Sequence, residues 1–233
     1  MYQLYIANKN YSSWSLRPWV LMSQLGLGFE ERLIVFGDSN AWSAYRRLCP
    51  SGKVPCLFDG DMGVWDSLSI VEYLAERHAG VWPQDTRARA FARSAAAEMH
   101  SGFAELRKRC SMSCGVRVRL HALDAALEQD LARLTALWLD GLQRFGGPFL
   151  AGGQFTAADA FFAPVAFRIQ TYGLSLEAAA SAYAHRLLEL PSMQSWYAAA
   201  LAEPWRDADH EMEIGTYGSL LRDERRVPSP GIG

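Results

Sequence analysis

Hydrophobic and polar positions follow two different patterns along the chain. In the first 80 residues, short β-type apolar runs alternate with segments of helical spacing, and Asp59-Gly60-Asp61 is a tight-turn signal between the last two runs. From residue 88 onward, most apolar positions recur every three or four residues, as Leu127, Leu131 and Leu134 do. The pattern predicts an α+β N-terminal domain, with a small mixed sheet covered by helices, followed by an all-α domain. Strands are expected at residues 3–7, 31–35, 54–58 and 63–65, and helices at 14–25, 67–77, 88–106, 118–145, 157–172, 175–190 and 192–202.

The junction of the two halves is expected where the β signal stops, in the segment that contains Trp82-Pro83. We predict an N-terminal domain over residues 1–80, a linker over 81–88 and a helical domain over 89–205. The tail over residues 206–233 is predicted to be irregular, since it ends in a run rich in Pro, Gly and Ser.

Composition narrows the classes of partner. The chain has 233 residues, of which 50% are hydrophobic and 21% charged, so it has enough apolar material for one or two cores. Its net charge of −2 gives no general attraction to nucleic acid or to an anionic membrane. No apolar run of about 18 residues could span a bilayer, and the N-terminus lacks the pattern of a signal peptide. We therefore expect a cytoplasmic protein with no nucleic-acid or membrane partner.

The four cysteines lack the C-x-x-C spacing of a zinc or redox site. Cys110 and Cys114 lie four residues apart, with His100 and His121 nearby in the sequence. Buried thiols and surface histidines are far more common than a metal site of that composition. We expect reduced thiols and no bound metal.

The first motif with candidate chemistry is Ser12-Ser13, between the first predicted strand and the first predicted helix. Pro18 is tolerated only in the first turn of a helix, so the helix should begin near residues 13–15. Both serines would then lie at the helix N-terminus, where free N–H groups and the helix dipole favour an anion. The plain alternative is that the serines only cap the helix.

The second motif is Lys53-Val54-Pro55. Because proline cannot donate a hydrogen bond to a sheet, Pro55 must begin the strand or lie at an edge. If the Val54–Pro55 bond were cis, the backbone of Val54 would turn outward and offer its N–H and C=O to an extended ligand. Taken alone, the motif is most simply a proline at the start of a strand.

The third motif is Asp66-Ser67, at the start of the helix predicted over residues 67–77. An acid and a hydroxyl at a helix N-terminus can hold an amino-acid head group, with its carboxylate at the helix end and its ammonium on Asp66. A simple N-cap explains the same two residues.

Taken in order, these features resemble a glutathione S-transferase. The order is a strand, a serine-rich helix start, Lys-Val-Pro, a hairpin, Asp-Ser at the start of a helix, and then a helical domain. Thr156 and Asp159 add a capping-box spacing, with Asp in place of the usual Glu or Gln, in the part of the helical domain where that family has such a box. The resemblance covers about residues 2–205. No single motif is specific, but all four occur in register.

The resemblance implies a thioredoxin-like N-terminal domain, a helical domain that holds a small hydrophobic electrophile, glutathione as co-substrate and a homodimer. Ser12 or Ser13 would donate a hydrogen bond to the glutathione sulfur. Val54 would pair its backbone with the cysteinyl part of glutathione, directly before a cis Pro55.

The resemblance also assigns the two ends of glutathione. Asp66 and Ser67 would bind the γ-glutamyl end, and Lys53 would meet the glycyl carboxylate. On the electrophile side, Phe103 or Arg107 could face the ligand, although a core position is the ordinary interpretation of such a helical stripe.

The serine site is similar to the serine-using zeta and tau classes. Zeta enzymes place Ser-Ser-Cys at this helix start, and counting back from Arg17 aligns Ser12 with their first serine. Trp14 stands where their cysteine would be, which argues against maleylacetoacetate isomerase and against thiol-transfer chemistry. Tyr5 and Tyr11 are less well placed than Ser12 for a tyrosine-type site.

Two alternatives stay open on the sequence. One is a protein of the same fold that binds ligands or assembles with partners without turnover. The other is a glutathione-dependent peroxidase or dehalogenase, because the electrophile pocket decides the reaction and the sequence does not define it.

Overall fold

The N-terminal part of the chain folds around a four-stranded mixed sheet in the computed structural model, which describes residues 1–226. The strand order is β2-β1-β3-β4, with β1 parallel to β2 and antiparallel to β3. The predicted hairpin is present, since β3 and β4 pair antiparallel across the tight turn. The strands are β1 (Tyr2–Ala7), β2 (Phe29–Ile34), β3 (Cys56–Asp59) and β4 (Met62–Trp65).

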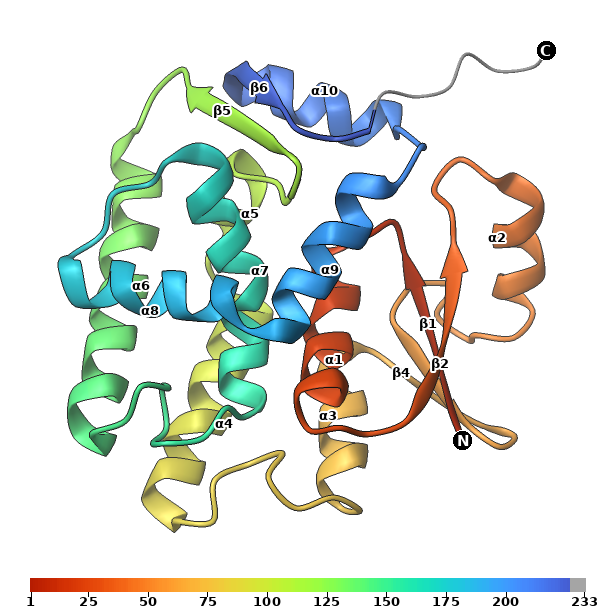
Figure 1. Cartoon of the computed structure of the whole chain (residues 1–233), viewed down its shortest axis with the longest axis horizontal. Helices are drawn as coiled ribbons and strands as arrows, with labels where there is room; N and C mark the ends of the chain where they lie inside the picture. Colours follow the sequence, from red (N-terminus) through yellow and green to blue (C-terminus); the bar gives the residue numbers. More distant parts are fainter. Residues whose placement is uncertain (227–233) are drawn as a thin grey trace.

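Three helices complete this part: α1 (Ser13–Gln24), α2 (Ser39–Arg46) and α3 (Ser67–Ala75). Figure 1 shows α1 and α3 between the sheet and the helical half, and α2 on the outer side of the sheet. Both faces of the sheet are therefore covered, as its apolar strands require.

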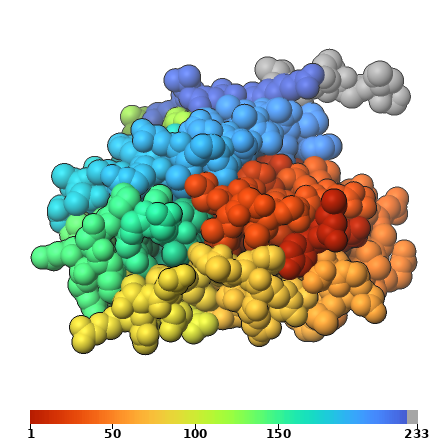
Figure 2. Space-filling model, turned by 60° about the horizontal axis from the view of Figure 1, so that its bottom comes forward, coloured from red at the N-terminus to blue at the C-terminus, as the bar shows by residue number. Residues whose placement is uncertain are grey.

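The second part of the chain is helical apart from one two-stranded ribbon. Its central helix, α7 (Ala157–Tyr172), is buried along almost its whole length and packs against α1, α4 and α8. Figure 2 shows that the two parts of the chain are in contact across the face in view. The other elements are α4 (Thr86–Ser101), α5 (Ala104–Arg109), β5 (Val116–Leu120), α6 (Ala125–Phe145), α8 (Ala178–Glu189), α9 (Pro191–Ala202), α10 (Ala208–Tyr217) and β6 (Gly218–Asp223).

Asp159 holds the start of α7, as its spacing from Thr156 predicts. The Asp159 carboxylate accepts from the Thr156 N–H at 2.9 Å and from the Leu150 N–H at 3.0 Å. The Tyr183 hydroxyl donates to it at 2.8 Å. A fully buried carboxylate is tolerated because these donors replace water.

Two predicted helices differ from the structure by five residues or more at one end. The helix predicted over 88–106 ends at Ser101, and α5 begins after Gly102 and Phe103, which has a φ of +53°. The helix predicted over 118–145 is wrong at its start, where residues 116–120 form β5.

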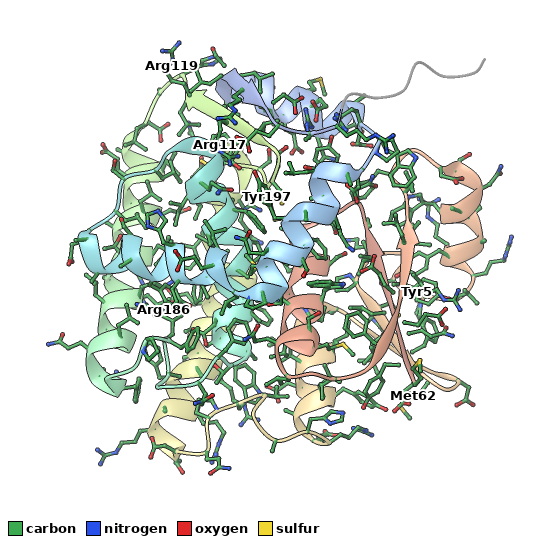
Figure 3. The ribbon with its side chains drawn as sticks, viewed as in Figure 1. Tyr5, Met62, Arg117, Arg119, Arg186 and Tyr197 are labelled. Carbon is green, nitrogen blue, oxygen red and sulfur yellow. The ribbon has the colours of Figure 1, made fainter. Side chains whose placement is uncertain are left out.

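The ribbon forms because residues 116–120 alternate apolar and basic side chains. Val116 and Val118 are buried, while the Arg119 side chain points outward (Figure 3). The Arg117 guanidinium donates to the Tyr197 hydroxyl at 3.1 Å, which ties the strand to α9. The partner strand β6 comes from the tail, about 100 residues later. The local sequence pattern therefore could not predict that these two strands pair.

The prediction of an irregular tail is wrong for most of residues 206–226. They form α10 and β6, and β6 pairs antiparallel with β5. The remaining residues of the predicted tail, 227–233, lie outside the described residues.

All four cysteines are buried and form no disulfide, as the sequence predicts. In residues 1–226, none of the helices has the length and apolar character needed to cross a bilayer.

Candidate active site

Ser12 and Ser13 lie at the start of α1, as predicted, and both line a cavity of about 530 Å³ between the two parts of the chain. Their side chains are buried but differ in their partners. The Ser12 hydroxyl donates to Ser15 Oγ at 2.7 Å, and Ser15 Oγ also accepts from the Ala7 N–H at 3.2 Å. The Ser13 hydroxyl has no hydrogen-bond partner within residues 1–226. Neither serine side chain caps the helix, so the plain capping interpretation is not what the structure shows.

Two backbone N–H groups in the first turn of α1 have no hydrogen-bond acceptor within residues 1–226. They belong to Trp14 and Ser15. Unpaired N–H groups at a helix N-terminus present partial positive charge, which favours an anion. The two serine hydroxyls and two free N–H groups therefore form a set of donors for a negatively charged atom.

The Val54–Pro55 bond is cis, as the resemblance implied. Pro55 is buried, and the N–H and C=O groups of Val54 have no partner within residues 1–226. An extended ligand could pair with both groups as an added strand would. Lys53 is exposed beside them and forms no ion pair within the described residues.

Asp66 begins α3 in an unusual backbone conformation. Its φ is +73° and its ψ is 136°, a region that non-glycine residues rarely adopt and that costs about 1–3 kcal/mol. Its Oδ1 accepts from the Leu68 N–H at 2.8 Å, so it does cap the helix. Its Oδ2 lies 3.5 Å from Nε2 of His100, on α4, and burial lowers the pKa of that histidine. A helical-domain residue thus contacts a residue of the N-terminal domain.

A second cavity, of about 440 Å³, lies beside the first and contains Pro55, Asp66 and Ser67. Trp14, Lys53 and Val54 line both cavities, so the two are neighbours along one cleft. We call the cavity with Asp66 the peptide cavity and the cavity with Ser12 and Ser13 the outer cavity. Every residue that the sequence singled out for glutathione lines one or both of them.

A buried arginine, not predicted from the sequence, lies behind the peptide cavity. The Arg17 guanidinium lies between the rings of Trp14, at 4.1 Å, and Phe161, at 4.8 Å. It donates to Ser67 Oγ at 3.4 Å. Burial, together with the positive charges of Arg168 and Arg107, lowers the pKa of Arg17 to about 9. The only signal in the sequence is an arginine inside an otherwise apolar helix.

The sequence also missed the wall that the tail supplies. His210 and Glu213 of α10 line the outer cavity, and the His210 ring stacks on Tyr11 at 4.8 Å. The Tyr11 hydroxyl donates to Glu211 at 2.7 Å, and burial and that hydrogen bond raise its pKa far above the ordinary value. The Tyr11 hydroxyl is therefore held by residues of the tail.

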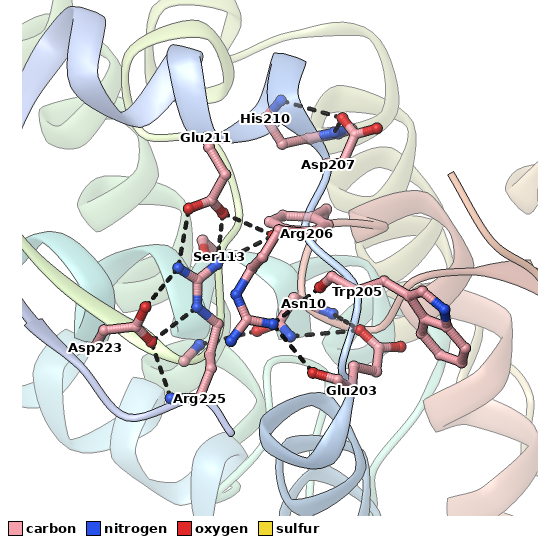
Figure 4. A network of polar contacts seen from close by, with 12 residues as sticks. Asn10, Ser113, Glu203, Trp205, Arg206, Asp207, His210, Glu211, Asp223 and Arg225 are labelled. Carbon is pink, nitrogen blue, oxygen red and sulfur yellow. Dashed lines mark hydrogen bonds and ion pairs between the residues drawn. The ribbon is translucent and has the colours of Figure 1, made fainter. Parts of the chain in front are cut away.

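Polar contacts hold this wall in place (Figure 4). The Arg225 guanidinium, almost fully buried, pairs with Glu211 and Asp223 and donates to the Tyr11 hydroxyl at 3.0 Å. Glu203 accepts from the backbone N–H groups of Lys9 and Asn10, at 2.6 Å and 3.2 Å. Both contacts join the end of the chain to the loop that precedes α1.

Phe103 and Arg107, the two residues considered for the electrophile side, lie differently. Arg107 lines the outer cavity, whereas Phe103 is buried outside its lining. Within residues 1–226 there is no cluster of side chains suited to a metal ion, and Cys110, Cys114, His100 and His121 form none.

Family models match both parts of the chain. Residues 11–77 match the glutathione S-transferase N-terminal domain, and residues 84–199 match the C-terminal domain. The chain belongs to the glutathione S-transferase family. It is therefore an enzyme of this family, with the fold that the sequence predicted.

Two relatives are similar to this chain along most of their length. Glutathione S-transferase 1 of Dianthus caryophyllus is 27% identical over 170 residues, which is 70% of this chain and 74% of the relative. A probable maleylacetoacetate isomerase of Caenorhabditis elegans is 26% identical over 181 residues, 74% of this chain and 81% of the relative.

Solved transferases share the fold at lower identity. The tau-class enzyme of mango, Mangifera indica, is 19% identical, with a TM-score of 0.66 over 92% of this chain and 97% of the other. A glutathione transferase homologue from Burkholderia, solved with bound glutathione, is 22% identical, with a TM-score of 0.62 over 85% of this chain and 97% of the other.

The Arg225 contacts generate a prediction about the tail of this transferase. Arg225→Met should speed amide hydrogen exchange throughout α10 by about tenfold or more, because it removes charge-assisted hydrogen bonds worth about 1.5–3 kcal/mol together. Arg222→Met is the matched control, since Arg222 is an exposed arginine three residues earlier, at the end of β6, whose ion pair within residues 1–226 is with Glu224. Equal exchange in the two variants would show that Arg225 does not hold the tail.

Proposed function

We propose that this transferase binds glutathione across the peptide cavity with its sulfur at the start of α1. In this proposal Asp66 and Ser67 hold the γ-glutamyl end, the free backbone of Val54 pairs with the cysteinyl part, and Lys53 meets the glycyl carboxylate. The presence of bound glutathione in the Burkholderia homologue supports this co-substrate. The strained conformation of Asp66 supports a role beyond helix capping.

The observation that carries the proposal is the set of donors at the start of α1. A cysteine-like thiol has a pKa near 8.5, so only about 3% of it is thiolate at pH 7. Each unit by which the site lowers that pKa corresponds to about 1.36 kcal/mol of preference for the thiolate. One serine hydroxyl and a helix N-terminus can together supply about two units.

Ser12 is our choice for the hydroxyl that donates to the sulfur. Its present acceptor is Ser15 Oγ, and the Ser15 oxygen is itself anchored by the Ala7 N–H. If both hydroxyl hydrogens rotate, Ser15 donates to Ser12 and Ser12 donates to the sulfur, so the chain of hydrogen bonds polarises toward the thiolate. Ser13, whose hydroxyl has no partner, is the alternative donor.

The thiolate then attacks an electrophilic carbon in the outer cavity. A sulfur–carbon bond forms, and in a substitution the bond to the leaving group breaks, with the leaving group taking the electron pair. The thiol proton passes to solvent when glutathione binds. The serine only donates a hydrogen bond, so the site needs no triad. Trp14, in the place of the zeta-class cysteine, argues against the isomerase reaction.

Removal of the Ser12 hydroxyl should separate binding from chemistry. Ser12→Ala should raise the pKa of the bound thiol by about one unit and lower kcat/KM for conjugation about tenfold near pH 6.5. Glutathione affinity at low pH should change little, because the neutral thiol gains little from the hydroxyl. Thiolate absorbance against pH, read with the conjugation rate, measures both effects. If Ser13→Ala shows this behaviour and Ser12→Ala does not, Ser13 is the donor.

Loss of the Asp66 carboxylate should weaken glutathione binding itself. Asp66→Ala should raise the calorimetric Kd about tenfold or more, because a charge-assisted contact to the γ-glutamyl ammonium is lost. Asp85→Ala is the matched control, since Asp85 caps α4 in the same way, accepting from the Ala88 N–H at 2.8 Å, and lies outside both cavities. Equal Kd values for the two variants would remove Asp66 from the binding site.

We also propose that the enzyme works in the cytoplasm as a homodimer, by analogy with its family. Sedimentation velocity at assay concentration should give the mass of two chains. A single-chain mass would refute this part of the proposal.

A further inference from the structure

The outer cavity is rich in positive charge. Among its lining residues, four are cationic and Glu213 is the only carboxylate. In the part of the chain that the structure describes, none of the four forms an ion pair, and neither does Glu213. The four cations are Lys53, Arg107, Lys108 and Arg168.

Arg168 is the least expected of these cations, because it is 5% exposed and comes from the central helix α7. Its Nη1 donates to the carbonyl oxygens of Arg107 and Cys110. Its Nε is buried without a partner, and its Nη2 has no acceptor within residues 1–226. A guanidinium carries five N–H donors in one plane, so most of the donors of Arg168 are unused. Burial lowers its pKa to about 10, which leaves it charged at neutral pH.

Arg107 lies next to it, on α5. Within residues 1–226 its Nε is also buried without a partner, and its Nη atoms reach only carbonyl oxygens, at 3.4 Å and 3.5 Å. Its guanidinium carbon lies 5.7 Å from the centre of the Trp14 ring, which Arg17 also contacts. Two guanidinium groups thus lie by the Trp14 ring, and Arg168 lines the same cavity.

This excess of charge requires a partner. An unpaired cation in a desolvated site is costly, and the usual remedy is an anion with matching geometry. A carboxylate accepts two parallel N–H donors from one guanidinium, which is why arginine is the residue that recognises it. The proposed glutathione contacts use Asp66, Ser67 and Lys53, all of which line the peptide cavity, so Arg107 and Arg168 are left for the second substrate.

We infer that the outer cavity takes an electrophile that carries a carboxylate, bound by Arg168 and Arg107, with its apolar body against the aromatic walls. Those walls are formed by Trp14, Phe36 and Trp42, together with Met112. The inference rests on the proposed function, because it names the substrate class for that same site. It also changes the expected electrophile, from simply hydrophobic to hydrophobic and acidic. The carboxylate takes no part in the reaction, and the sulfur–carbon bond forms elsewhere on the molecule.

Two glutathione conjugates of equal size test the charge alone. S-(3-carboxypropyl)glutathione carries an acid in the outer cavity, and S-(3-carbamoylpropyl)glutathione carries the neutral amide of the same shape. The acid should bind the unmodified enzyme about tenfold more tightly than the amide, measured by calorimetry at pH 7. Arg168→Gln and Arg107→Gln should each reduce this ratio to about threefold or less.

Two further variants test whether charge in the cavity lining sets the ratio of acid to amide affinity. Glu213→Gln removes the one negative charge of the lining and should raise the ratio. Arg133→Gln, an exposed arginine that pairs with Glu98 far from the cavity lining, should leave the ratio unchanged. If Arg168→Gln does not fold, Arg107→Gln still decides, because Arg107 is only half-buried.

The outcomes separate this inference from the proposed function. If glutathione and both conjugates bind and the acid and amide bind equally, the inference is overturned and the proposed function stands. If glutathione and both conjugates fail to bind, both are overturned. A ratio that survives in Arg107→Gln and in a folded Arg168→Gln also overturns the inference, because the acid is then recognised by other residues.

Discussion

Helix α1 is enclosed on almost every side, and this constraint decides where both cavities lie. Nine of its twelve residues are buried, against the sheet, α3, α7 and α9. A helix packed in this way cannot shift without opening the core of both halves of the chain. Its N-terminus therefore presents Ser12, Ser13 and two free N–H groups at a fixed place. The donors are therefore in place before a ligand arrives, and such preorganised donors stabilise negative charge.

The same packing explains why a charged residue lies inside the core. Arg17 follows Ser13 by one helical turn and so projects from the same region of α1. It contacts Trp14, Phe161 and Ser67, one residue from each of three helices. A leucine there would fill similar space, but it would add no positive charge behind the peptide cavity. The arginine thus joins three helices and places a positive charge beside Ser67.

Elements that depend on short-range interactions could be predicted from the sequence. The start of α1, the β3–β4 hairpin, the start of α3 and the Thr156–Asp159 pair depend on residues within a few positions of one another. The ribbon of β5 and β6 was not predictable, because its two strands lie about 100 residues apart. Likewise, Arg168 is one more polar residue of a helix in the sequence, and only its contacts in the folded chain show that most of its donors are unused. The positions of the candidate residues agree with the sequence analysis, while their roles remain predictions.

The contact between Asp66 and His100 gives the two halves of the chain a shared element at the ligand site. Asp66 begins a helix of the sheet domain, and His100 belongs to α4, the helix that leads into α5 and Arg107. Suppose that a ligand in the outer cavity moves α4 and so changes the affinity of the peptide cavity. Thermodynamic linkage then requires a ligand in the peptide cavity to change the affinity of the outer cavity by the same factor. Any cooperativity between the two substrates must therefore be mutual, whichever of them binds first.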